Sequence, residues 1–284
     1  LVESANISYH EKTLGQLFCD DSASQIITML KNKMACENVT LRLGCQISSI
    51  QRTDNFHIFL DGFEIMSDSL VIACGGKSIP KIGASNFGYR IAQQFGIKII
   101  DTRPALVPLV FSNLDLTKMK RLAGLSLNAK VSCNTQSFND GFLFTHRGLS
   151  GPSVLQISSY WSEEKKIRIN LYPQEDITEK ILKIKMTGGQ KRAENVLSEL
   201  LPKRLAKAIL SNAGIYGNLA DQSKKDLQAL GELVHNWTLK PAGSEGYRTA
   251  EVTLGGIDTN ENQNVTIASI SGTTINIDGG YTIL

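Results

Sequence analysis

Hydrophobic and polar positions follow different patterns along the chain, and the first hundred residues mix both main types. Short β-like runs are expected at four places, 39–43, 46–51, 57–60 and 63–66. The last two flank Asp61-Gly62, a dipeptide typical of a hairpin turn. A helix is expected before them, because the apolar residues 23, 26, 27, 30 and 34 share one helical face. A second helix is expected over 86–95, ended by Gly96.

The most informative segment runs from residue 70 to residue 89. Residues 70–74 are a continuous apolar run without alternation, which predicts a strand buried on both faces, as in a parallel sheet. Gly75 and Gly76 follow at its carboxyl end, where open α/β sheets bind ligands and where glycine lets backbone N–H groups approach a phosphate or ribose. The alternative is a tight strand-to-loop turn, and the glycine pair alone favours neither interpretation.

Beyond Arg103 the pattern changes to a β-rich region interrupted by helices. β-like runs are expected at 106–111, 125–133, 141–145 and 166–172, and again at 249–254. Pro152 fits the first turn of a helix reaching Trp161. Residues 173–240 have helical periodicity, and Pro202 should break or kink one of these helices. The order predicts an α/β protein in which a β-rich domain carries a helical insertion.

Composition narrows the possible functions. The chain has 284 residues, 42% of them hydrophobic, and a net charge of +3 without a dense Lys/Arg run, so we expect no nucleic-acid partner. No apolar run approaches the ~20 residues that span a bilayer, so we expect no membrane partner. The five cysteines form no CxxC pair and the histidines show no ligand spacing, which predicts neither a disulfide framework nor a metal site, and reduced thiols in a cytoplasmic protein.

Five sequence blocks, at 7–20, 70–96, 103–109, 143–158 and 245–259, resemble the HI0933-like family of bacterial NAD(P)/FAD-dependent oxidoreductases in content, order and spacing. The resemblance extends over about nine-tenths of the chain. It implies a partial Rossmann-like FAD-binding domain at 1–104 and an inserted β-rich, barrel-like domain at 105–172 and 241–259. It further implies a helical insertion at 173–240 and leaves 260–284 as an atypical C-terminal segment.

By this resemblance, FAD would take a hydride from NAD(P)H and pass it to a small organic acceptor. The backbone of Ile47 would meet the adenine edge. Ala73, Cys74, Gly75 and Gly76 match the family's Ala-Thr-Gly-Gly, which lies beside the adenosine and pyrophosphate half of FAD. Cys74 replaces the usual Thr, and a thiol is a poorer hydrogen-bond partner. A buried packing role for Cys74 is the alternative that we favour over redox chemistry.

Residues 144–152 form a second candidate site. His146 could transfer a proton to or from a substrate, and Arg147 could pair with a carboxylate or a nucleotide phosphate. The alternative, which carries more weight, is that both residues brace the turn through hydrogen bonds to loop carbonyls. No catalytic residue is assigned beyond these two candidates.

The chain departs from the family pattern in two places. The dinucleotide fingerprint G-x-G-x-x-G is absent, and so is the family's closing Gly-Glu-Val-Leu-Asp motif; we therefore expect an incomplete piece of a longer protein. Residues 269–284 instead resemble the end of a short-chain dehydrogenase, but the Tyr-x-x-x-Lys pair of those enzymes is missing and Asp278 receives no role. Two hypotheses stay open: a flavoprotein oxidoreductase, or a non-catalytic remnant that binds no FAD. The oligomeric state is left open.

Overall fold

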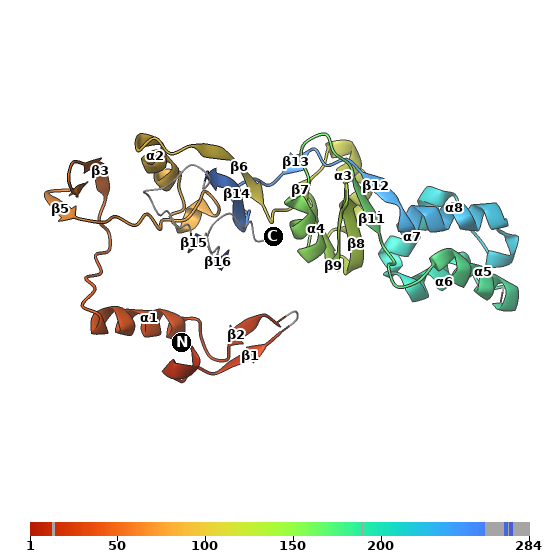
Figure 1. Cartoon of the computed structure of the whole chain (residues 1–284). Coiled ribbons are helices and arrows are strands. Elements are labelled where there is room, and N and C mark those ends of the chain that lie inside the picture. The colour runs from red at the N-terminus through yellow and green to blue at the C-terminus, as the bar shows by residue number, and fades with distance from the viewer. Residues whose placement is uncertain (13–14, 189, 259–269, 272, 275–284) are drawn as a thin grey trace. The chain divides into compact units, whose positions relative to one another are not determined.

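The computed structural model describes residues 1–12, 15–188, 190–258, 270–271 and 273–274. It shows a mixed α/β fold that divides into two compact units, Leu1–Leu70 and Val71–Leu284 (Figure 1). None of the described helices combines the length and apolarity needed to cross a membrane.

The first unit contains two small antiparallel sheets and one helix. After a short 3-10 turn, η1 (Glu3–Ala5), the hairpin of β1 (Tyr9–Glu11) and β2 (Leu17–Cys19) precedes helix α1 (Ser24–Cys36). The sheet that follows has the order β3 (Ile47–Arg52), β4 (Phe56–Leu60) and β5 (Phe63–Ser67). The predicted helix and the hairpin at Asp61-Gly62 are confirmed. The strand expected at 39–43 is wrong, because these residues lie in irregular structure without a paired neighbour.

The buried strand predicted at residues 70–74 is also wrong. These residues form no strand, and the Val71 side chain is 70% exposed. A strand forms only where its N–H and C=O groups pair with a neighbouring strand, and no such pairing is found for this segment in the described part of the chain. The 3-10 turn η3 (Pro80–Ile82) and helix α2 (Phe87–Gln94) follow. Gly96 has a positive φ just after α2, as predicted for the residue that ends this helix.

A long-range strand pair supports α2. Strand β6 (Ile99–Ala105) pairs antiparallel with β14 (Val252–Ile257), and the register shifts between Leu254 and Gly256. Gly255 lies at this bulge with φ +76°, where a Cβ would be 2.3 Å from the carbonyl oxygen of Asp101. Only glycine fits this close approach of two backbones.

The largest sheet has seven antiparallel strands in the order β12-β11-β8-β9-β10-β7-β13. The strands are β7 (Leu109–Val110), β8 (Ser126–Cys133), β9 (Gln136–Phe144), β10 (Gly148–Ser150), β11 (Ile167–Asn170), β12 (Trp237–Leu239) and β13 (Gly243–Ser244). Helix α3 (Asn113–Met119) and the 3-10 turn η4 (Lys120–Leu122) connect β7 to β8. Helix α4 (Pro152–Ser158) begins at Pro152 as predicted and contacts β8 and β9 (Figure 1).

The barrel-like domain predicted here is an open sheet, because no strand pairing joins its edge strands β12 and β13 among the described residues. The sheet is nevertheless strongly curved. Only three residues separate Leu239 from Gly243, so the two edges lie at most about 14 Å apart. Seven strands laid flat would place their edges about 29 Å apart.

Helices α5 (Ile177–Gly188), α6 (Ala193–Leu200), α7 (Lys203–Ala213) and α8 (Lys224–His235) lie between β11 and β12 in the chain, with a 3-10 turn, η5 (Leu219–Asp221), before α8. The break predicted at Pro202 is confirmed, since α6 ends and α7 begins on either side of it. Helix α8 starts with a capping box in which Ser223 and Asp226 bond each other's backbone N–H.

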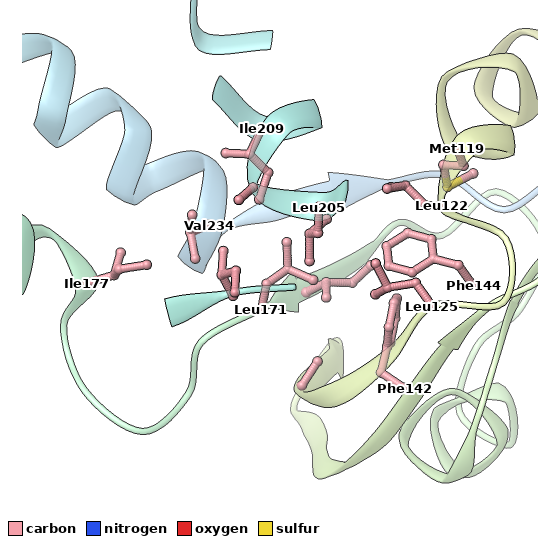
Figure 2. Close-up of a cluster of buried hydrophobic side chains, with 14 of the residues drawn as sticks. Met119, Leu122, Leu125, Phe142, Phe144, Leu171, Ile177, Leu205, Ile209 and Val234 are labelled. Atoms are coloured by element: carbon pink, nitrogen blue, oxygen red, sulfur yellow. The ribbon is translucent and has the colours of Figure 1, made fainter. Parts of the chain in front are cut away.

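One apolar core runs from the sheet into these helices. Figure 2 shows Phe142 and Phe144 of β9 in the same cluster as Leu205 and Ile209 of α7 and Val234 of α8. At the C-terminus, β15 (Ile270–Ser271) pairs with β16 (Thr273–Thr274). The other residues of the dehydrogenase-like tail, Asp278 included, lie outside the described residues.

Candidate functional site

The loop after the glycine pair lies across strand β14. The backbone N–H of Lys77 donates to Thr253 Oγ1 at 3.1 Å, and the Ser78 hydroxyl lies 2.9 Å from the same oxygen. The N–H of Ile79 donates to the carbonyl oxygen of Tyr247 at 2.9 Å. Ile79 is β-branched yet has φ +57°, a conformation that costs about 1–3 kcal/mol and that these contacts must hold in place.

The Lys77 ammonium group is the centre of this arrangement. It donates to Thr102 Oγ1 at 2.8 Å and lies 5.7 Å from the ring centroids of both Tyr89 and Tyr247. These distances are within the range of cation–π attraction. An ammonium group has three N–H donors, and Thr102 is its one recorded acceptor in the described part of the chain. Lys77 can therefore donate to a further acceptor.

Two phenol groups, those of Tyr89 and Tyr247, flank Lys77. Burial raises the pKa of Tyr89 above its usual value, and the neighbouring Tyr247 and Cys74 raise it further. Tyr89 thus keeps its O–H at neutral pH and can donate a hydrogen bond. The hydroxyl of Tyr247 is buried without a hydrogen-bond partner among the described residues. A buried hydroxyl without a partner is unfavourable, so a ligand atom could satisfy it.

A cavity of about 220 Å³ opens beside Lys77. Its walls include Asn86, Tyr89 and Arg90 from the α2 region and Asp101 and Thr102 from β6. An ammonium, a guanidinium, an amide and a hydroxyl are donors that suit phosphate oxygens, whereas the Asp101 carboxylate opposes an anion on its own side. The balance of donors favours a phosphate or ribose group.

The size of the cavity limits what it can hold. Pockets for ligands of drug size have volumes of about 300–1,000 Å³, so this cavity accommodates one part of a dinucleotide rather than the whole. The donor set fits the phosphate-bearing part of such a molecule.

The two glycines of the predicted backbone ledge have different surroundings. A Cβ on Gly76 would lie 2.8 Å from Thr253 Oγ1 and 2.9 Å from Tyr89 Oη, so the missing side chain of Gly76 makes room for these protein groups. Gly75 has φ +71° and is partly buried. Gly75 is therefore the position at which a ligand could approach the backbone closely.

The other predicted cofactor contacts belong to both units of the chain. Ala73 and Cys74 directly precede the glycines, and the Cys74 sulfur lies 3.0 Å from the place of a Cβ on Gly88 of α2. Cys74 is exposed, so the buried position expected for its side chain is wrong. Ile47 belongs to β3 of the first unit and is 37% exposed. The contacts of these residues with FAD stay predictions.

His146 and Arg147 lie at the turn between β9 and β10, and both are exposed. The turn is braced by Thr145, whose hydroxyl accepts the N–H groups of Arg147 and Gly148 at 3.2 and 3.0 Å. The backbone carbonyl of Arg147 also accepts the N–H of Phe111. The backbone and Thr145 thus hold the turn, and a catalytic role for His146 and Arg147 stays a prediction.

Sequence reasoning missed Lys77, Tyr89, Thr102, Tyr247 and Thr253. All five lie in or beside the blocks that carry the family resemblance, at 70–96, 103–109 and 245–259. A search for polar residues shared among these blocks could have found the set. Their convergence in space depends on the β6–β14 pairing, which no local pattern reveals.

Three relatives are similar to the chain. Ribosomal RNA dihydrouridine synthase of Escherichia coli (strain K12) is 44% identical over 268 residues, which are 92% of this chain and 66% of the relative. The protein of the same name from Haemophilus influenzae is 39% identical over 91% of this chain and 66% of the relative. The 3-dehydro-bile acid delta(4,6)-reductase of Clostridium scindens is 26% identical over 85% and 62%. The chain spans about two thirds of the length of these relatives.

The expectation of no nucleic-acid partner is wrong, because the first two relatives are named for action on ribosomal RNA. The error came from judging the net charge of the whole chain. Residues 1–70 contain five Lys or Arg against nine Asp or Glu, whereas residues 71–284 contain 25 against 18. A small net charge thus conceals an acidic first unit and a basic second unit.

A family model gives the broader assignment. The model described as "HI0933-like protein barrel and H2TH domain" matches residues 103–252, which include the curved sheet, helices α5 to α8 and the start of β14. This match covers more than half of the chain. The chain therefore belongs to the HI0933-like family.

Proposed function

We propose that the protein is an FAD-dependent reductase that converts uridine in ribosomal RNA to dihydrouridine, with NAD(P)H as the source of hydride. Two relatives named for this reaction, each similar over more than nine-tenths of the chain, support the substrate. One observation carries the cofactor assignment. Lys77 forms hydrogen bonds with Thr102 and Thr253, so three segments in or beside the family-resembling blocks meet at Lys77. The cavity at this point is lined by donors that suit a phosphate.

The names of the relatives describe one type of chemistry. Dihydrouridine differs from uridine by two hydrogens added across the C5–C6 double bond, which is conjugated with a carbonyl group. The name of the bile acid relative likewise describes the reduction of double bonds. Each reduction needs one hydride and one proton. A reduced flavin, when bound, supplies the hydride.

The residues of this chain would bind and orient the cofactor. Lys77 and Arg90 would hold its phosphates through charge-assisted hydrogen bonds, and the backbone at Gly75 would lie beside the adenosine half. The neutral Tyr89 hydroxyl would add an uncharged hydrogen bond, and the buried Tyr247 hydroxyl would add another. The positive charge of residues 71–284 supports an RNA substrate, since phosphate neutralisation dominates RNA affinity. The reaction would then take place in the cytoplasm, with ribosomal RNA.

The first test is direct. The protein is purified, mixed with FAD and NADPH, and incubated with ribosomal RNA that lacks dihydrouridine; nucleosides are then analysed by mass spectrometry. We expect a yellow protein and the appearance of dihydrouridine. A colourless protein that takes up no FAD supports the non-catalytic alternative. A yellow protein that reduces a conjugated steroid ketone but not RNA contradicts the proposed substrate.

A second test addresses Lys77. The Lys77→Met variant should bind FAD about 10- to 100-fold more weakly, because a hydrogen bond to a charged group contributes about 1.5–3 kcal/mol. Lys81→Met is the matched control, since Lys81 is an exposed lysine of the same loop that does not line the cavity. FAD affinity is measured by the quenching of flavin fluorescence. Equal affinity of the two variants contradicts the proposed role of Lys77.

A further inference from the structure

Two basic dipeptides from distant parts of the sequence lie next to each other on the surface of the second unit. Lys120-Arg121 belongs to η4, and Lys203-Arg204 begins α7. The guanidinium Nη1 of Arg204 donates to the carbonyl oxygen of Arg121 at 3.2 Å and lies 3.4 Å from that of Ala123. We call the four residues Lys120, Arg121, Lys203 and Arg204 the basic junction.

The core beneath the basic junction fixes its geometry. Leu122 of η4 and Leu205 of α7 are both buried in the shared apolar cluster, directly after the two basic dipeptides (Figure 2). All four charged side chains are exposed. The fold therefore places four basic residues on two contacting elements and leaves their side chains exposed.

Among the residues whose side chains are described, no acidic group pairs with the basic junction. No ion pair is recorded for any of the four residues within the described part of the chain, and the first turns of η4 and α7 contain no acidic residue. Glu194 of α6 already pairs with Lys207, which lies one turn further along α7, at 3.2 Å. Four like charges held close together repel one another, and an external polyanion would relieve that repulsion.

Resting on the proposed function, we propose that the basic junction binds the phosphate backbone of the ribosomal RNA substrate. Four cations on two elements exceed what one small anion would neutralise, but they match the closely spaced charges of a nucleic-acid strand. Contacts of this kind position RNA without reading its sequence. The basic junction is thus a positioning surface, separate from the residues that line the Lys77 cavity.

The test removes three of the four charges and leaves Arg204, which braces η4. In the variant Lys120→Gln/Arg121→Gln/Lys203→Gln, binding of a fluorescent ribosomal RNA fragment is measured by anisotropy over a series of salt concentrations. The control is Lys183→Gln/Lys224→Gln/Lys225→Gln, which removes three exposed lysines of α5 and α8 and changes the net charge equally. Flavin content and circular dichroism check that both variants are folded.

We expect the junction variant to bind RNA about 10- to 100-fold more weakly at moderate salt, with a salt-dependence slope smaller by about 2. The control should lose less than about threefold. Equal losses in the two variants, when the wild type binds RNA, overturn the inference and leave the proposed function standing. A wild type that binds no RNA overturns both. If the junction variant loses binding to phosphatidylglycerol vesicles but binds RNA as the wild type does, the inference is also overturned, because the basic junction would then bind a lipid surface.

Discussion

The first unit differs in the placement of its apolar side chains from the part of the second unit that runs from β7 to β12, which we call the body. From Leu109 to Val234, large apolar residues of strands and helices pack into one buried cluster. Among the described residues up to Leu70, the buried apolar side chains are Ile7, Met29, Ile50 and Ile58, while Leu17, Phe18, Leu43, Phe63 and Met66 are exposed. Local patterns form the elements of both regions, but packing stabilises only the body to a large extent.

The largest effect should come from the core of the body. Phe142 is 1% exposed, and its ring packs edge-on against that of Phe144, with 5.1 Å between the ring centroids. Phe142→Ala should therefore lower the free energy of unfolding by about 3–5 kcal/mol. Phe63 of the first unit is 39% exposed, and Phe63→Ala should cost about 0.5 kcal/mol or less.

Urea unfolding can separate the two regions. Both tryptophans, Trp161 and Trp237, lie in the body, so their fluorescence reports on the body alone. Hydrogen exchange reports on the first unit. Similar losses for Phe142→Ala and Phe63→Ala would remove the distinction between the regions.

A smaller effect should follow from filling the contact between two helices. A Cβ on Gly231 of α8 would lie 1.8 Å from Thr178 Oγ1 and 3.1 Å from Thr178 Cβ in α5. Gly231→Ala should therefore destabilise the body by about 1–3 kcal/mol, although alanine is the better helix former. The double variant Gly231→Ala/Thr178→Ala removes the clashing oxygen and should recover much of the loss in thermal unfolding. An unchanged stability of the single variant would show that the helices separate without cost.

The smallest effect concerns the N-terminus of α8. Ser223→Ala removes the cap and should cost about 1 kcal/mol. The side-chain hydrogen bond from Ser223 lowers the pKa of Asp226, so its stabilisation is present above the unfolded pKa and is lost as the pH falls through the folded pKa. Urea unfolding at neutral and acid pH should show a smaller acid-side loss in Ser223→Ala than in the wild type. An identical pH dependence would contradict the role of this hydrogen bond.

Sequence patterns predicted elements best where the signals were local. The turn at Asp61-Gly62, the end of α2 at Gly96 and the break at Pro202 each depend on the conformational preferences of one or two residues. The failure at 70–74 has another cause: apolarity alone does not make a strand without a paired neighbour. Strand β6 pairs with a segment about 150 residues away, and no local signal predicts that pairing.

The same distinction applies to the candidate site. The glycine pair drew attention to the loop that contains Lys77, but the side chains that line the cavity there include Lys77, Tyr89 and Thr102. Their approach depends on the bulge at Gly255 and on Thr253 of β14, far along the chain. Individual residue types could be noted from the sequence, whereas their convergence required the fold.

The pairing of Ile169 with Trp237 places the entry and exit of helices α5 to α8 on adjacent strands. Adjacent residues on antiparallel strands are about 5 Å apart, so a tight turn could replace the whole helical segment without changing the connectivity of the sheet. Such an excision would nevertheless remove Leu205, Ile209 and Val234 from the apolar cluster that also contains Phe142 and Phe144. The helical segment is thus unnecessary for the connectivity of the sheet, yet it contributes part of the apolar core that the sheet shares.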